Sequence, residues 1–146
     1  MRHRFAISIG ATVAALALAG TAVAAGTCFG VKRSATLTGA AESPAGDPDG
    51  SGRAVIGLNV GEGLVCWSMT VKGIATAAAS HIHKAPAGSS GPVVVTLGTP
   101  ASGAAKGCTS AARSLIRDIL AKPGEYYVNV HNKDFPAGAV RGQLGV

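Results

Sequence analysis

Short apolar segments that alternate with polar residues recur along most of this chain, and turn-forming residues separate them. Segment 53–60, for example, places Ala54, Ile56, Leu58 and Val60 on one side. Successive side chains of a β-strand point to opposite faces, so this period of two predicts a strand with one buried face. The segments with this alternation or with a β-branched composition are 35–39, 53–60, 64–71, 77–83, 92–97, 126–131 and 139–146. Many short strands separated by Gly and Pro predict an all-β, antiparallel, Greek-key-like β-sandwich.

One segment has a helical period instead. The apolar residues of segment 111–121 recur at spacings of three and four, which predicts a short helix. Thr109 or Ser110 is expected to cap its N-terminus, and the Pro-Gly pair after Lys122 is expected to end it. The predicted fold class is therefore all-β with one short helix.

The N-terminus has the order of features that export signals share. Two arginines stand within the first five residues, an apolar and alanine-rich stretch follows at 6–20, and small residues follow at 21–25. This order predicts a signal peptide over residues 1–25, cleaved after Ala24 or Ala25. The alternative is an uncleaved membrane anchor, but polar and glycine residues interrupt an apolar stretch that is barely long enough to cross a bilayer.

Export has consequences for the rest of the chain. The prediction is a linker at 26–33 and one domain at 34–146, located in the periplasm, on the cell surface or outside the cell, with no membrane span after cleavage. Loss of Arg2 and Arg4 lowers the formal net charge from +6 to +4. The remaining basic residues are scattered along the sequence and aromatic residues are few, so we predict no nucleic-acid partner and interpret the charge as a solvated surface.

Three cysteines follow the predicted signal peptide. Oxidised pairs are usual in exported proteins, and we predict a disulfide between Cys66, in a strand-like segment, and Cys108, in a Gly-Cys-Thr segment. Closing a loop of about 43 residues stabilises a fold by on the order of 4 kcal/mol in the chain-entropy model. Cys28 is left over. Lipidation is the alternative use for Cys28, although Ala25 stands where lipoprotein signals usually have leucine.

Three histidines and one arginine lie on polar faces of the predicted strands. His81 and His83 are two positions apart, so their imidazoles point the same way. In segment 126–131 the valines form the core face, which places His131 on the opposite face. The same alternation in the last strand puts Arg141 on a face away from the core.

Four motifs carry a resemblance to a known family. They are Ser80-His81-Ile82-His83, Gly91-Pro92-Val93-Val94-Val95, Tyr126-Tyr127-Val128-Asn129-Val130-His131, and Phe135-Pro136-x-Gly138-x-x-Arg141-Gly142-Gln143-Leu144. In this combination the chain resembles the chordin-repeat (CHRD) family over residues 34–146. The resemblance implies an extracellular or periplasmic β-domain from a family with no assigned chemical activity. It therefore implies a non-enzymatic binding or structural module, whose partner would be an extracytoplasmic protein or glycan.

A weaker resemblance connects the same residues with the copper/zinc superoxide dismutases. In that family a His-x-His pair and a later histidine bind copper, and an arginine near the C-terminus guides the anionic substrate. The matching positions here are His81, His83, His131 and Arg141. The metal-bridging histidine and the zinc ligands of that family are missing, because segment 84–92 contains no ligand residue. The resemblance therefore implies at most a mononuclear three-histidine site, which suits copper or zinc.

Three interpretations of the histidines stay open. In the first, His81 and His131 are hydrogen-bonding struts between strands, with Ser80 and Asn129 as partners and Arg141 bonded to carbonyls or an acid. In the second, all three histidines bind one copper or zinc ion. In the third, the protein is a dismutase-like enzyme whose Arg141 faces the anion. The glutamates form no carboxylate pair of the kind that glycoside hydrolysis needs, so we predict no other catalytic residues.

Overall fold

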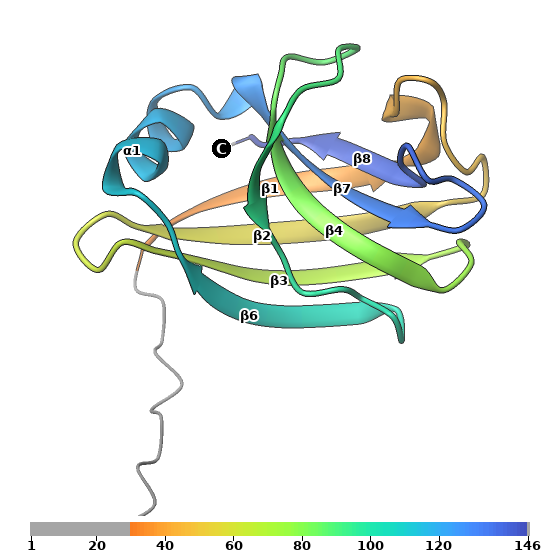
Figure 1. Ribbon diagram of the computed structural model, residues 1–146, viewed down its shortest axis with the longest axis horizontal. Helices are drawn as coiled ribbons and strands as arrows, with labels where there is room; N and C mark the ends of the chain where they lie inside the picture. The colour runs from red at the N-terminus through yellow and green to blue at the C-terminus, as the bar shows by residue number, and fades with distance from the viewer. Residues whose placement is uncertain (1–29, 146) are drawn as a thin grey trace, which may run out of the picture.

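All strands of the computed structural model, which describes residues 30–145, belong to one antiparallel sheet (Figure 1). The strands are β1 (Val31–Thr38), β2 (Ser51–Asn59), β3 (Leu64–Lys72), β4 (Ala77–Lys84), β5 (Val93–Thr96), β6 (Ala104–Ser110), β7 (Tyr126–Asn132) and β8 (Val140–Gln143). One helix, α1 (Arg113–Ala121), and two 3-10 turns, η1 (Gly39–Ala41) and η2 (Pro123–Glu125), complete the described part. The strand order is β5-β4-β7-β8-β1-β2-β3-β6.

The sheet curls into two layers at the junction of β1 and β8, where backbone pairing is sparse. β1 pairs with β2 along its whole length but with β8 only at Thr38 and Arg141, next to an isolated bridge from Ser34 to Gly145. The β5-β4-β7-β8 layer covers the β1-β2-β3-β6 layer, and Figure 1 shows β4 crossing in front of β2 and β3. Consecutive strands such as β3 and β4 lie in different layers, so the predicted all-β, antiparallel, sandwich-like fold is confirmed.

The hydrophobic core lies between the two layers. Its residues occupy alternate strand positions, as the period of two predicts, and the largest of them are at most 2% exposed: Leu37, Ile56, Leu58, Met69, Ile82, Val128 and Val130. Full burial of a side chain of this size contributes about 1.5–3 kcal/mol. The core thus fixes which face of each strand points outward.

Helix α1 covers one end of the layers with Ile116 and Ile119, which are fully buried. Its N-cap position is Ala112, and no side chain caps it. The capping role predicted for Thr109 or Ser110 is wrong, because both residues belong to β6 and pair with β3. The helix itself matches the predicted segment.

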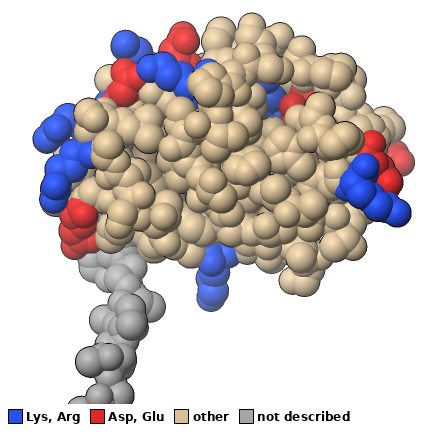
Figure 2. Space-filling view, viewed as in Figure 1, with Lys and Arg blue, Asp and Glu red and all other residues tan. Residues whose placement is uncertain are grey.

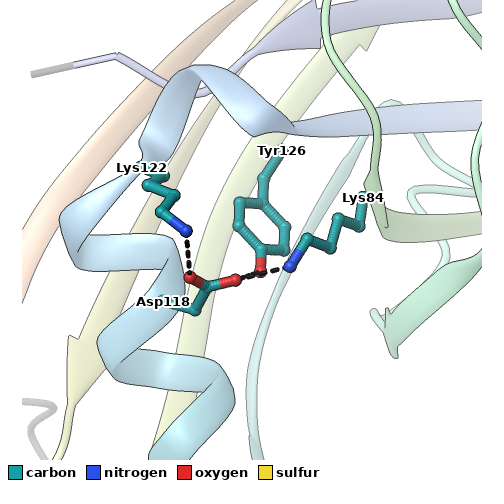
Figure 3. A network of polar contacts seen from close by, with 4 residues as sticks. All are labelled: Lys84, Asp118, Lys122 and Tyr126. Atoms are coloured by element: carbon teal, nitrogen blue, oxygen red, sulfur yellow. Dashed lines mark hydrogen bonds and ion pairs between the residues drawn. The ribbon is translucent and has the colours of Figure 1, made fainter.

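A polar network ties α1 to the β4 and β7 strands (Figure 3). Asp118 of α1 accepts hydrogen bonds from Lys84 Nζ at 2.6 Å and from the Tyr126 hydroxyl at 2.5 Å, and Lys122 Nζ lies 3.4 Å from its other oxygen. The hydrogen bonds from Lys84 and Tyr126 hold the pKa of Asp118 below its ordinary value. The helix is therefore held by a charged contact as well as by its apolar face.

Some predicted boundaries differ from the structure. β6 was not predicted, because its sequence lacks apolar alternation and is rich in Ala and Gly; pairing with β3 makes it a strand. β1 begins at Val31, inside the segment predicted as a linker at 26–33. In β5, Val95 is buried but Val93 is 48% exposed, because this strand lies at the edge of the sheet. The predicted signal peptide at 1–25 and Cys28 lie outside the described residues. Within residues 30–145, no helix has both the length and the apolar character needed to cross a bilayer.

The predicted disulfide between Cys66 and Cys108 is confirmed. The two residues are direct cross-strand partners on β3 and β6, and the bond closes a sequence separation of 42 residues. It attaches the edge strand β6 to the body of the sheet, on the face away from the core.

Removing this bridge is expected to destabilise the fold by about 2–4 kcal/mol, because the unfolded chain regains the entropy of an open loop. Urea unfolding of the Cys66→Ser/Cys108→Ser variant measures the effect. Cys28→Ser is the matched control, since it removes a cysteine without touching the bridge. Equal midpoints for the double variant and the wild type would contradict the prediction.

Candidate metal centre

Three histidines from two neighbouring strands share one face of the outer layer. His81 and His83 lie on β4, and His131 lies on β7. His81 is paired with Asn129, so His131 is its diagonal neighbour, and the two rings approach with His81 Nδ1 3.2 Å from His131 Nε2. The ring of His83 lies 5.5 Å from that of His81 and 6.1 Å from that of His131, between centroids. The structure thus brings together all three histidines singled out from the sequence.

The spacing of the ring nitrogens is close to that of a metal site. One nitrogen from each histidine lies within 4.8 Å of the others. A tetrahedral copper or zinc ion with bonds of about 2.0–2.1 Å requires ligand nitrogens about 3.3 Å apart. The nitrogens of His81 and His131 are already at this distance, and small rotations of the rings would bring the His83 nitrogen to a similar distance from both. His83 is 8% exposed while His81 and His131 are partly exposed, so the site is reached from the side of the latter two.

Backbone carbonyls orient two of the rings. His83 Nδ1 donates to the Gly91 carbonyl at 2.8 Å, and His131 Nδ1 donates to the Pro136 carbonyl at 3.1 Å. A carbonyl oxygen can only accept, so both Nδ1 atoms carry the hydrogen and both Nε2 atoms have a lone pair. The lone pair of His131 accepts a hydrogen bond from His81 Nδ1, and that of His83 has no partner. Histidines that bind metals are usually held in this way: one ring nitrogen binds the metal, and the other donates to a carbonyl or carboxylate.

The Nε2 atom of His83 is buried and has no hydrogen-bond partner. Its ring is fixed by stacking on Tyr127, with centroids 4.8 Å apart and ring planes 6° from parallel. Leaving a buried acceptor unpaired costs about 1–3 kcal/mol. A metal ion bound at this lone pair would remove that cost.

The electrostatic environment keeps the partly exposed rings neutral. Burial lowers the pKa of His81, and the neighbouring His131 and His83 lower it further. Burial also lowers the pKa of His131, against a raising effect of the hydrogen bond to Pro136. Neutral imidazole is the form that binds metals, so the lowered pKa values of His81 and His131 favour metal binding by these two rings.

Arg141 lies on the same face but is covered by segment 84–92. It is 1% exposed, and its guanidinium donates to the carbonyls of Ser89 at 2.7 Å and Pro86 at 2.9 Å and to the Gln143 side chain at 2.9 Å. Its Cζ atom lies 3.4 Å from the centre of the Tyr127 ring. Because β7 lies between β4 and β8, Tyr127 separates Arg141 from His83. Arg141 therefore acts as a clamp on carbonyls, and its guanidinium does not face solvent.

The partners predicted for the histidines as struts are wrong. The Ser80 hydroxyl donates to the Gly98 carbonyl, and the Asn129 side chain bonds to Glu42, so neither is hydrogen-bonded to an imidazole in the described residues. The actual partners differ: the rings of His81 and His131 hydrogen-bond to each other across β4 and β7, and His83 and His131 donate to the backbone carbonyls of Gly91 and Pro136. No residue type marks such an acceptor, although both residues lie in the motifs that carry the family resemblance.

Glu42 is a further buried polar residue of this region that the sequence did not reveal. It is 9% exposed, lies near Arg141, and its Oε1 has no hydrogen-bond partner. A side chain at Gly138 would place a Cβ 2.1 Å from Oε1, so only glycine fits there. Burial raises the pKa of Glu42 to about 7, although Arg141 and the hydrogen bond from Asn129 lower it.

This raised pKa predicts a specific pH dependence of stability. The folded chain keeps the Glu42 proton up to about pH 7, while the unfolded chain loses it near 4.5. Between these values the folded state binds more protons, so the contribution of Glu42 to the free energy of unfolding falls as pH rises. Relative to wild type, Glu42→Gln should gain up to about 3 kcal/mol between these limits.

Urea unfolding of both proteins from pH 4.5 to 8 measures this difference. The comparison cancels the contribution of His81 and His131, whose lowered pKa values make stability rise with pH in both proteins. Parallel curves would show that Glu42 ionises at its ordinary pKa in the folded state.

Comparison with known families gives one match. The profile described as the CHRD domain matches residues 33–144. These residues include all eight strands except the first two positions of β1, together with the three histidines and the disulfide. No curated protein sequence matches the chain.

Proposed function

Because the chain belongs to the CHRD family, a class of extracellular-type binding or structural modules, we propose that it is an exported, non-enzymatic domain that binds one copper or zinc ion. The proposed ligands are His81, His83 and His131. The disulfide between Cys66 and Cys108 supports a location in an oxidising compartment.

The observation that carries this proposal is the unpaired lone pair of His83. A histidine that served only as a strut would have both ring nitrogens satisfied or one of them in water. Here the Gly91 carbonyl fixes the tautomer, the stack on Tyr127 fixes the ring, and the remaining nitrogen is buried beside two further imidazoles. Imidazole nitrogen is a ligand that copper and zinc share, and hard cations such as magnesium prefer oxygen.

Two features support binding without catalysis. Arg141, the residue that would guide an anionic substrate, has its guanidinium bonded to backbone carbonyls under segment 84–92. Among the described residues, the hydrogen-bond partners of the His81 and His131 rings are an imidazole and a backbone carbonyl, and neither is a carboxylate. An ion held here would stabilise the pairing of β4 with β7, since it binds residues from both strands.

Isothermal titration of the mature protein with zinc and with copper(II) tests the proposal. We expect saturation at one ion per chain for both metals and no binding of magnesium. Binding of magnesium with similar affinity, or no saturation at one equivalent, would contradict a three-imidazole site.

A further inference from the structure

The outer surface of the β1-β2-β3-β6 layer gathers basic side chains from distant parts of the sequence. Lys32 of β1, Arg53 of β2, Lys72 of β3 and Lys106 of β6 are all exposed, and they occupy strand positions that alternate with the core residues. We call this surface the cationic face and define it by these four residues. The basic residues are scattered along the sequence, so only the strand register reveals that they share a face.

The cationic face accounts for the net charge of the described protein. Of the 13 basic residues of the chain, Arg2 and Arg4 precede the described part, and the other 11 exceed the 7 acidic residues by four. No acidic residue occupies β1, β2, β3 or β6, and none of the four cations forms an ion pair within the described residues. In Figure 2 acidic and basic side chains occur together at the ends of the molecule, so charge elsewhere is largely compensated.

Hydroxyl and small side chains fill the space between the cations. Ser34, Thr36, Ser68 and Thr70 point outward on the central strands, and Thr36 and Thr70 are the cross-strand neighbours of Arg53. Shallow hollows lined by Ser68 or Thr70 adjoin each of the four cations. The surface is therefore nearly flat, and it offers hydrogen-bond donors and acceptors around the positive charges.

The separations between the cations fit an extended ligand. Strands are about 4.8 Å apart and residues rise about 3.4 Å along a strand, so the four positions lie between about 8 and 22 Å from one another. Only Arg53 and Lys72, which are diagonal neighbours on adjacent strands, are close enough for one small anion to contact both, and no small anion can contact all four cations. A polymer with repeated negative charges can contact all of them at once.

We infer that the cationic face binds an acidic polysaccharide, through its sulfate or carboxylate groups and its hydroxyls. Charge complementarity requires a polyanion. A nucleic acid is a poorer fit, because none of the outward positions carries an aromatic side chain on which bases could stack. An anionic membrane is also a poorer fit, because the larger aliphatic side chains at outward positions, Val55 and Leu64, are half-buried and no aromatic ring accompanies them for insertion into lipid.

Two charge-matched triple variants test this inference with heparin as the probe. Arg53→Gln/Lys72→Gln/Lys106→Gln removes one arginine and two lysines from the cationic face. Arg117→Gln/Lys122→Gln/Lys133→Gln removes the same residue types from other exposed positions and serves as the control. Polygalacturonate, neutral dextran, double-stranded DNA and anionic phospholipid vesicles are assayed beside heparin.

The face variant should bind heparin at least about tenfold more weakly than wild type at 0.1 M salt, and the slope of log Kd against log salt should fall by about two to three. The heparin affinity of the control variant should stay within about twofold of wild type, because charges outside the cationic face are screened by salt. Polygalacturonate should bind and dextran should not. Equal losses for the two triple variants would overturn the inference, as would tighter binding of DNA or vesicles than of either polysaccharide.

Zinc and copper titrations of the face variant should match wild type, because the histidines lie on the other layer. The metal proposal and the polysaccharide proposal can therefore fail independently.

Discussion

Replacing His83 with alanine is expected to weaken zinc or copper binding by at least about a hundredfold. Structural zinc sites with four ligands bind with about 10–16 kcal/mol, so one ligand contributes about 3 kcal/mol, and each 1.4 kcal/mol is a factor of ten. His83 is the most informative of the three positions, because its Nε2 is buried and has no hydrogen-bond partner among the described residues. Its loss removes the ligand that is best fixed before the metal arrives.

Competition with a metal chelator measures this change. Thr96→Ala is a suitable control, because Thr96 pairs with His81 across the β4–β5 ladder but contributes no imidazole. His81→Ala and His131→Ala should each weaken binding in the same way. Equal affinity of His83→Ala and wild type would show that the rings converge without forming a site.

Replacing Arg141 with alanine is expected to destabilise the domain by about 5 kcal/mol or more, which is close to the whole stability of a small domain. The substitution removes three hydrogen bonds from a charged donor, to the carbonyls of Ser89 and Pro86 and to the side chain of Gln143, and each such bond contributes about 1.5–3 kcal/mol. It also leaves a cavity beside the ring of Tyr127, because Arg141 is among the largest fully buried side chains.

Arg117→Ala is the control for this substitution, since Arg117 is exposed on α1. We expect its urea midpoint to match wild type, while Arg141→Ala should unfold at much lower urea or fail to accumulate as folded protein. Near-identical stabilities of the two variants would mean that the carbonyl clamp contributes little. Arg141 would then be free for another role, such as facing an anion.

The strands that the sequence predicts well are those whose own residues specify the pattern. β2 alternates buried Ala54, Ile56 and Leu58 with outward residues, so period and burial agree. β6 lacks such a signal, because it gains its strand conformation from pairing with β3 and from the disulfide. The capping error at α1 has the same origin: Thr109 and Ser110 are typical caps, but the ladder with β3 holds them as strand.

The sequence predicted the three histidines of the candidate site, but it did not predict the groups that orient their rings. Alternation puts His81, His83 and His131 on outward faces, and pairing of β4 with β7 brings them together. The carbonyls that orient the rings depend on the path of the connecting loops, which no local pattern encodes. The burial of Arg141 beneath segment 84–92 and the position of Glu42 beside it follow from the same tertiary arrangement.

The two proposed sites lie on different layers of the protein. The histidines occupy the β4 and β7 strands, while the cationic face belongs to the layer of β1, β2, β3 and β6. A metal-binding surface and a polysaccharide-binding surface can therefore be occupied at the same time. If both proposals hold, the domain can bind an acidic polysaccharide and a metal ion together.

Anomalous diffraction from crystals of the mature protein grown with zinc or copper tests the central claim most directly. The predicted result is one peak bonded to the ring nitrogens of His81, His83 and His131 at about 2.0–2.1 Å. The Nδ1 atoms of His83 and His131 should still donate to the Gly91 and Pro136 carbonyls. A metal-soaked crystal with no anomalous peak at these rings, or with the ion bound elsewhere on the chain, would contradict it.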